Sequence, residues 1–275
     1  MIRDDFAVLI LTHGRADKVY TIKRVLEAGN YTGKYYLVID DEDDQAGEYI
    51  KRYGREKVQV FCKQAVDDRI DTMDTFHEHR AIVYARNAAF DVARKLGLKY
   101  FLEFDDDYID CQFRADDGRK LKVMSCRDLD TLFESMLDFL DDTGALTVAF
   151  CQGGDFNGGK NNSRLREQVL RKAMNSFFCR VDKPVDFFGT INEDVNMYTL
   201  LGSRGGIDNV YRGSNDSAKA DAENRRRNDR IISGWWDVQE IVLQRDGNAV
   251  GSYRESYGKQ AHAYAPSCKL GMLRT

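Results

Sequence analysis

Two aspartates separated by one residue, Asp105 and Asp107, have the spacing most specific for chemistry in this sequence. They follow an apolar stretch of strand length, residues 99–104, so their side chains are expected to point to the same side. Carboxylate oxygens are ligands that Mg²⁺ and Mn²⁺ prefer, and a metal held there neutralises a diphosphate leaving group. A solvated acidic turn is the alternative, but the position of this pair after a fourth expected strand favours the metal site.

A second acidic pair, Glu193 and Asp194, opens an expected helix over residues 193–201. A carboxylate at a helix N-terminus caps the helix and interacts favourably with its dipole. The same carboxylate is placed to act as a general base toward an acceptor hydroxyl. Position alone leaves both roles open.

Four further polar positions are candidates for ligand binding. Arg86 and Asn87 interrupt the apolar side of an expected helix over residues 82–96, and Arg80 lies just before it. A cation there is useful for reaching phosphate, and a surface arginine is the alternative. His262 lies in a late alternating stretch and is a candidate metal ligand or a structural histidine.

A glycine-rich stretch, Gly154 to Asn161, nearly matches a phosphate-binding P-loop and follows an expected strand. However, Asn161 stands where Ser or Thr should bind Mg²⁺, and the acidic strand precedes this loop instead of following it. We therefore interpret the stretch as a glycine-rich loop near an acceptor site.

The elements that must position these side chains alternate along the first hundred residues. Four continuous apolar runs predict strands over residues 6–11, 35–39, 57–61 and 99–104. The segments between them contain apolar residues at helical spacing. Such runs belong to parallel sheets that are buried on both faces. We therefore expect an α/β fold with a Rossmann-like, mostly parallel central sheet flanked by helices. Open sheets of this kind bind ligands beyond the carboxyl ends of their strands, where Thr12, Asp40 and Asp105 stand.

The second half of the chain changes pattern. A helix is expected over residues 129–140, and strands are expected over residues 146–152, 173–180 and 237–244. Residues 207–234 belong to a Gly-, Ser-, Asn- and Arg-rich stretch that is typical of a mobile insertion. With no repeat and no linker, we predict one domain over residues 1–275, divided functionally near residue 110.

The net charge of −4 argues against a general nucleic-acid binder, but the charges are unevenly distributed. Residues 157–180 contain six Lys or Arg and one Glu, and residues 224–230 contain four Arg and one Asp. These basic segments suit a polyanionic partner or form solvated surface. Composition excludes disordered and collagen-like classes, and no apolar run approaches the length of a membrane span. Six cysteines without Cys-x-x-Cys spacing favour a cytoplasmic protein with reduced thiols.

A series of motifs in fixed order resembles the TET/JBP-associated glycosyltransferases of bacteriophages, which are related to the base J glucosyltransferase and the GREB-type proteins. The motifs are AVLILTHGR (7–15), RAIVYARN (80–87), YFLEFDDDY (100–108), AFCQGGD (149–155), KAMNS (172–176), INEDVN (191–196) and LGSRG (201–205). A fainter similarity continues in YAPSC (264–268). The series is specific to the family and not to one sugar.

The resemblance implies a GT-A fold, a UDP-sugar donor, Mn²⁺ or Mg²⁺, and hydroxymethylated DNA as acceptor, with residues 1–110 as the donor-binding half and 111–275 as the acceptor-binding half. Its implied donor contacts are Thr12, His13, Gly14, Arg15, Asp40, Arg80, Arg86, Asn87, Asp105 and Asp106. Its implied metal ligands are Asp105, Asp107 and His262. Asp194 would be the general base of an inverting reaction, with Glu193 as the alternative.

The acceptor residues implied by the same resemblance are Gln152, Gly153, Gly154, Asp155 and Asn175. Contacts to the DNA backbone would come from Lys160, Arg225, Arg226 and Arg227. The alternatives are a glycosyltransferase for a small molecule or glycan, a nucleotidyltransferase, and a non-catalytic DNA-binding module. The intact acidic residues argue against the last of these, and the basic segments favour a polyanionic acceptor.

Overall fold

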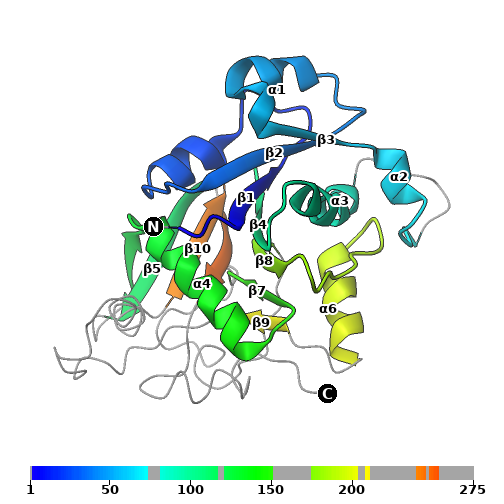
Figure 1. The fold of residues 1–275 in the computed structure, drawn as a ribbon. Helices are drawn as coiled ribbons and strands as arrows, with labels where there is room; N and C mark the ends of the chain where they lie inside the picture. Colours follow the sequence, from blue (N-terminus) through cyan, green and yellow to red (C-terminus); the bar gives the residue numbers. More distant parts are fainter. Residues whose placement is uncertain are drawn as a thin grey trace.

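The computed structural model describes residues 2–73, 81–116, 121–150, 175–203, 208–210, 240–245 and 248–253. In these residues a seven-stranded sheet forms the centre, and a second, antiparallel sheet of four strands continues from it (Figure 1). The central strands are β1 (Phe6–Leu11), β2 (Lys34–Asp40), β3 (Val58–Phe61), β4 (Tyr100–Asp105), β7 (Thr147–Ala149), β8 (Phe177–Arg180) and β9 (Asp208–Val210). The second sheet contains β5 (Tyr108–Asp116), β6 (Leu121–Ser125), β10 (Glu240–Arg245) and β11 (Asn248–Tyr253).

The order in the central sheet is β3-β2-β1-β4-β8-β7-β9. Strands β3, β2, β1 and β4 are parallel, whereas β8 runs antiparallel to both β4 and β7. Strand β9 returns to the parallel direction beside β7. The expected mostly parallel central sheet is therefore confirmed.

Helices cover both faces of this sheet. They are η1 (Ile22–Glu27, a π-helical turn), α1 (Ala46–Tyr53), η2 (Arg55–Lys57, a 3₁₀ turn), α2 (Lys63–Asp67), α3 (Val83–Lys95), α4 (Leu129–Thr143) and α6 (Glu193–Ser203). Helices α3 and α4 lie on opposite sides of the central strands (Figure 1). All six residues of β1 are buried, because alternate side chains enter two separate hydrophobic clusters. This is the pattern that a continuous apolar run predicts for a parallel strand.

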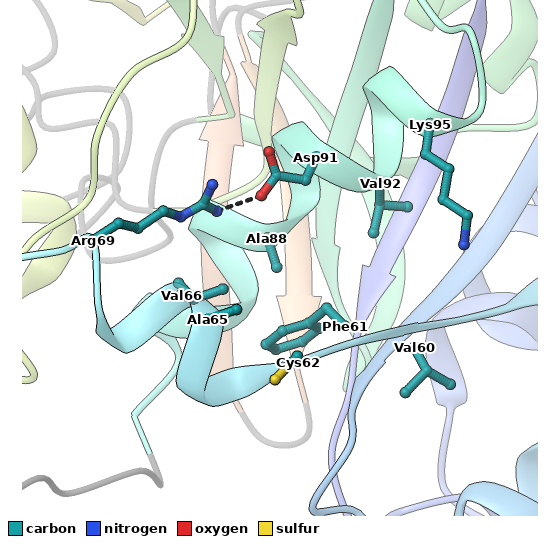
Figure 2. Close-up of a pocket in the computed structure, with 10 residues that line it drawn as sticks. All are labelled: Val60, Phe61, Cys62, Ala65, Val66, Arg69, Ala88, Asp91, Val92 and Lys95. Carbon is teal, nitrogen blue, oxygen red and sulfur yellow. Dashed lines mark ion pairs between the residues drawn. The ribbon is translucent and has the colours of Figure 1, made fainter.

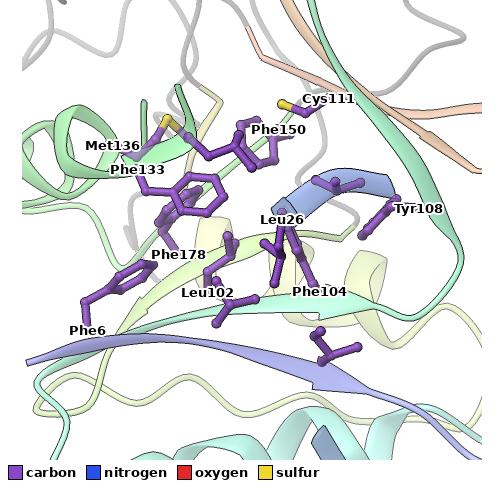
Figure 3. Packing of buried hydrophobic residues seen from close by; sticks show 14 of the residues in the cluster. Phe6, Leu26, Leu102, Phe104, Tyr108, Cys111, Phe133, Met136, Phe150 and Phe178 are labelled. Carbon is purple, nitrogen blue, oxygen red and sulfur yellow. The ribbon is translucent and has the colours of Figure 1, made fainter. Parts of the chain in front are cut away.

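An aromatic cluster packs α4 against the central sheet, including β4 (Figure 3). Strand β4 leads into the three consecutive aspartates 105–107, here called the acidic turn. The ring centroid of Phe133 lies 6.1 Å from that of Phe6, 6.0 Å from Phe104 and 5.6 Å from Phe178. Truncating a buried phenylalanine to alanine costs about 3–5 kcal/mol, so these contacts hold β4 firmly in the sheet. The position of Asp105, the last residue of β4, follows from this packing.

Helix α4 agrees closely with its expected range, because the local capping signals are strong. The Asp128 carboxylate accepts a hydrogen bond from the Thr131 amide at 3.1 Å and caps the N-terminus. Gly144 ends the helix with φ at +65°, a left-handed conformation that glycine adopts without strain.

The antiparallel sheet was not expected from the sequence. Strands β5 and β6 form a hairpin directly after the acidic turn, and β10 pairs with the other edge of β5. Apolar and polar residues alternate along β5 from Ile109 to Asp116, which is the pattern of a half-buried strand, but a search for continuous apolar runs overlooks it. Its pairing with a strand far along the chain is decided only in the tertiary structure.

Candidate functional site

The structure brings the ends of three parallel strands to one edge of the sheet. Leu11 at the end of β1 is in register with Asp105 of β4 on one side and with Val38 of β2 on the other. Asp40 ends β2 beside Phe61 of β3. The polar residues that follow β1 therefore lie between those that end β2 and β4, as expected for parallel strands whose carboxyl ends meet at one edge.

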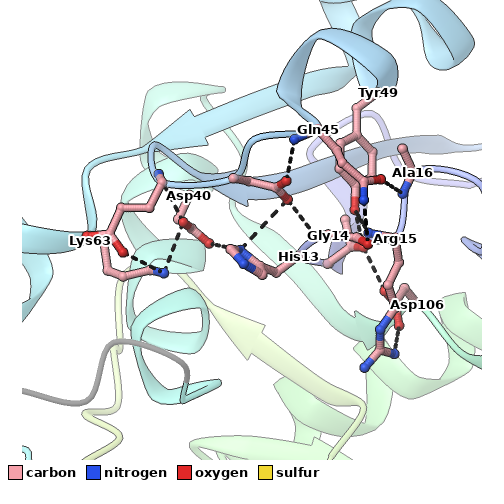
Figure 4. A network of polar contacts seen from close by, with 12 residues as sticks. His13, Gly14, Arg15, Ala16, Asp40, Gln45, Tyr49, Lys63 and Asp106 are labelled. Carbon is pink, nitrogen blue, oxygen red and sulfur yellow. Dashed lines mark hydrogen bonds and ion pairs between the residues drawn. The ribbon is translucent and has the colours of Figure 1, made fainter.

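The central aspartate of the acidic turn connects this turn to the end of β1 (Figure 4). The Thr12 hydroxyl donates to Asp106 Oδ2 at 2.6 Å, and Arg15 Nη1 donates to Oδ1 at 3.1 Å. Burial raises the pKa of Asp106, although Thr12 and Arg15 favour its charged form. Because both oxygens already accept hydrogen bonds, this geometry supports a positioning role for Asp106.

Tyr49 of α1 strengthens the same connection. Its hydroxyl lies 2.8 Å from Thr12 Oγ1 and accepts a hydrogen bond from the Arg15 amide at 2.9 Å. Since the Thr12 hydroxyl proton is used on Asp106, the Tyr49 hydroxyl donates to Thr12. Burial raises the pKa of Tyr49 to about 12, so it remains a donor at neutral pH.

A second branch of this network holds the loop after β1 against the end of β2 (Figure 4). His13 Nδ1 lies 2.7 Å from Asp40 Oδ2, and Lys63 Nζ lies 3.0 Å from the other oxygen of Asp40. The amide of Gly14 donates to Asp43 Oδ2 at 2.8 Å. Gly14 has φ at +63°, a left-handed conformation that glycine adopts without strain. A Cβ atom there would meet nothing within 4 Å, so the backbone conformation, and not a lack of space, explains the glycine.

Several residues of this network were missed by sequence reasoning. They are Asp43, Gln45, Tyr49 and Lys63. Gln45 accepts from the Ala16 amide at 3.0 Å and donates to the Gly14 carbonyl at 2.8 Å. The acidic run 40–44 was the available signal, but a charge run does not show which of its members turn inward.

The outer two aspartates of the acidic turn differ from the central one. Asp105 and Asp107 are partly exposed, whereas Asp106 is buried. Thr21 fixes the turn, since its hydroxyl donates to the Asp105 carbonyl at 2.6 Å and accepts from the Tyr108 amide at 3.0 Å. Two carboxylates at i and i+2 form a hard-oxygen donor set that fits Mg²⁺ or Mn²⁺.

A complete metal centre is not assembled by the described part of the chain. Among those residues no group of three or more His, Cys, Asp or Glu side chains is placed to hold a metal ion. The expected third ligand, His262, lies outside the described residues. The metal set therefore stays a prediction, supported by the chemistry of Asp105 and Asp107.

Arg86 has internal partners in place of an open path to a ligand. Its side chain is 4% exposed, its Nη1 donates to Glu103 Oε2 at 3.2 Å, and its Nε donates to Glu193 Oε1 at 3.1 Å. Burial lowers the pKa of Arg86, but Glu103 and Glu193 raise it by more, so the guanidinium remains charged. Direct contact of Arg86 with a donor phosphate stays a prediction, and these pairs support a different role.

Glu103 is a charged residue within an otherwise apolar strand. It is fully buried, and burial raises its pKa above the usual range, an effect that the adjacent Arg86 opposes by favouring the charged form. Its Oε1 has no hydrogen-bond partner among the described residues. A glutamate in a buried strand is rare unless it is paired, so the sequence contained a signal for this contact that reasoning from motifs overlooked.

The second acidic pair begins α6, as expected. Asn192 precedes it with φ at +56°, and its carbonyl accepts from the Asn196 amide at 2.9 Å, which closes the first turn. Asn tolerates the left-handed conformation better than most residues. Asp194 is nearly buried, and burial raises its pKa, an effect opposed by hydrogen bonding to the Val195 amide. A raised pKa suits a group that must take up a proton.

Asn87 connects α3 to the segment that leads into α6. Its amide nitrogen donates to the carbonyls of Val83 and Phe187, each at 2.8 Å, and its oxygen accepts from the Phe187 amide at 3.1 Å. Asn175, an expected acceptor residue, is buried before β8. The expected ligand contacts of both asparagines stay predictions.

Ten other expected site residues lie outside the described part of the chain. The site residues outside the described part of the chain are Arg80, Gln152, Gly153, Gly154, Asp155, Lys160, Arg225, Arg226, Arg227 and His262. Most of the expected insertion 207–234 also lies outside it.

Two hollows lie away from the acidic turn. One, of about 260 Å³, is lined by residues of β3, α2 and α3, with the Arg69–Asp91 ion pair at its edge (Figure 2). The other, of about 860 Å³, lies among η1, α1 and the β5–β6 hairpin and is lined by residues that include Tyr20, Arg24 and Arg127. Neither is lined by Asp105, Asp107 or Asp194, so we base the candidate site on the converging side chains.

No helix in the described residues is both long enough and apolar enough to cross a bilayer.

Comparisons with known proteins identify the family. No curated protein matches the sequence. A solved structure of the galactosyltransferase LgtC, in complex with donor and acceptor sugar analogs, is similar over 95% of this chain and 92% of that chain, with 10% identity and a TM-score of 0.39. The family model of the TET-associated glycosyltransferases matches residues 6–211. Because that match covers most of the chain and ends just beyond α6, this protein belongs to the TET-associated glycosyltransferase family.

Proposed function

We propose that this glycosyltransferase moves a sugar, such as glucose or arabinose, from a UDP-sugar to DNA. The acceptor is the hydroxymethyl group of 5-hydroxymethylcytosine or 5-hydroxymethyluracil in phage DNA, and the modification protects that DNA from host nucleases. The observation that carries the proposal is the common edge of β1, β2 and β4, to which Thr12, Asp40 and Asp105 contribute. Beyond that edge, Arg86 connects β4 to the acidic start of α6.

The donor side of the site consists of the loop after β1 and the acidic turn. The network of Asp43, Gln45 and Tyr49 holds residues 12–16 in one conformation, so their exposed groups need little reordering when the donor binds. Asp105 and Asp107 would hold the divalent cation. That cation supplies charge neutralisation for the leaving diphosphate.

The acceptor side of the reaction depends on α6. In a single displacement the acceptor oxygen bonds to the anomeric carbon as the bond to the diphosphate oxygen breaks, and the hydroxyl proton passes to a carboxylate. Glu193 is engaged by Arg86, which favours its neighbour Asp194 as the base. Product with inverted anomeric configuration is expected.

The DNA acceptor is supported by family membership and by charge. The basic segments 157–180 and 224–230 suit a polyanion on a chain with a net charge of −4. Binding that depends on these segments should weaken steeply with salt, because neutralised phosphates release counterions. A cytoplasmic location is part of the proposal.

The test is mass spectrometry of nucleosides from hydroxymethylated DNA after incubation with the protein, Mn²⁺ and a panel of nucleotide sugars. The expected product is a hydroxymethylpyrimidine nucleoside heavier by one sugar residue. Matched DNA without hydroxymethyl groups and the Asp194→Asn variant serve as controls. If every donor leaves the hydroxymethylated DNA unchanged while a free glycan or small molecule is glycosylated, the DNA acceptor is wrong.

A further inference from the structure

The guanidinium of Arg86 is enclosed by groups from separate elements. Arg86 belongs to α3, and its Cζ lies 5.3 Å from the ring centroid of Phe177 on β8 and 5.6 Å from that of Phe187, which precedes α6. Aromatic rings at these distances attract a cation. The orientation of this side chain is therefore set by the protein itself.

Each nitrogen of Arg86 faces a different carboxylate. Nη1 lies 3.2 Å from Glu103 and Nε lies 3.1 Å from Glu193, while Nη2 is 4.0 Å from Oδ1 of Asp105. Glu103 and Asp105 belong to β4, whereas Glu193 is the first residue of α6. One side chain thus contacts both the strand that ends in the acidic turn and the helix that carries Asp194.

We propose, on the basis of the function proposed above, that Arg86 is a positioning residue that sets the separation between Asp105 and Asp194. Glu193 and Asp194 are adjacent in the first turn of α6, so a displacement of Glu193 carries Asp194 with it. Asn87, the next residue of α3, donates to the Phe187 carbonyl and supports the same segment.

The physical reason is the charge balance of a buried cluster. Without Arg86, Glu103 and Glu193 would face each other with no cation between them, and like charges in a buried place separate or neutralise. Movement of the first turn of α6 by about 1 Å would place the base wrongly, and errors of that size cost about 10²-fold in rate.

The experiment compares Arg86→Gln with the double variant Arg86→Gln/Glu103→Gln. Arg94→Gln is the matched control, because Arg94 is on the same helix and pairs with Asp91 at the exposed surface. In the double variant Glu103→Gln removes the buried charge that Arg86→Gln leaves without a partner, which lowers the free-energy cost of burying that side chain. Glu193 still lacks its partner Arg86. We expect thermal stability to recover in the double variant, while kcat stays about 10²-fold low and donor KM changes by less than about threefold.

Three outcomes would overturn the proposal. A large rise in donor KM with kcat retained would identify Arg86 as a donor contact. Recovery of both stability and kcat in the double variant would reduce its role to balancing the charge of Glu103. Unchanged kinetics in Arg86→Gln would also overturn it.

Hydrogen exchange separates this proposal from the function on which it rests. In residues 190–200, the backbone amides of Arg86→Gln should exchange faster than those of the wild type and of Arg94→Gln. In α1, residues 46–53, all three proteins should exchange at the same rate. That result would support the contact even if hydroxymethylated DNA proved not to be the acceptor, and hydrolysis of the UDP-sugar would then supply the kinetics. Unchanged exchange in residues 190–200 would overturn the proposal whatever the acceptor is.

Discussion

The edge formed by β1 and β2 and the cluster around Arg86 are both polar, but they are held together differently. At the edge, Thr12, Tyr49 and Asp106 form a chain of hydrogen bonds, to which Arg15 donates through both its amide and its side chain. In the cluster, one buried guanidinium pairs with both Glu103 and Glu193. We therefore expect the edge to tolerate the loss of a single contact, whereas the cluster depends on a single cation.

The largest expected effect is on turnover in Asp194→Asn. This change removes the proposed base beside the cluster and leaves the Arg86–Glu193 contact in place. Loss of a general base lowers the rate by about 10²–10⁴-fold. Initial rates with saturating donor and acceptor measure this effect. A loss of only a few-fold would show that the base lies elsewhere.

The pH dependence of Asp194 has a definite sign. Because burial raises its pKa, wild-type turnover should fall as pH decreases through that raised value. A raised folded-state pKa also means that the stabilising effect of protonation is present at low pH and is lost as pH rises through it. The unfolding free energy of Asp194→Asn at neutral pH should therefore be no lower than that of the wild type, which urea denaturation measures.

The second largest effect is on the stability of Arg86→Gln. Removing one partner of a buried ion pair costs about 3–5 kcal/mol of unfolding free energy. Urea denaturation followed by circular dichroism measures it. Arg94→Gln, which breaks an exposed pair on the same helix, should change stability by less than about 1 kcal/mol. Equal losses in the two variants would remove the distinction between cluster and surface.

The third effect concerns Asp105 and Asp107, which lie where the two regions meet. Asp107→Asn removes a carboxylate ligand and should lower turnover by about 10²–10³-fold, the loss typical when transition-state charge is no longer stabilised. EDTA should reduce wild-type turnover similarly, and added Mn²⁺ should restore it. Full activity in EDTA would contradict the metal role.

The smallest effect is expected at the edge, in Tyr49→Phe. The hydroxyl of Tyr49 donates to Thr12 and accepts from the Arg15 amide, but Thr12 keeps its bond to Asp106. Loss of such hydrogen bonds costs about 1–3 kcal/mol, nearer the lower limit where other contacts remain. Thermal denaturation measures it. A loss as large as that of Arg86→Gln would show that the edge also depends on one side chain.

Much of the fold was determined by local pattern in the sequence. The continuous apolar runs of β1 and β4 predict buried parallel strands, because a strand covered on both faces needs apolar side chains in both directions. The same pattern placed Thr12, Asp40 and Asp105 at one edge, since parallel strands end on the same side. The start of α6 at Glu193 followed from its helical spacing.

Contacts between distant segments were decided only by the tertiary structure. Sequence spacing marks Arg86 as a cation on the apolar side of α3, but its partners Glu103 and Glu193 come from other elements, and only packing brings them within 3.2 Å. The antiparallel order of β8 beside β4 is likewise absent from periodicity, because an apolar run is compatible with either direction. Local propensity therefore determined which residues end strands, and packing decided that the buried Arg86 connects two of the acidic groups.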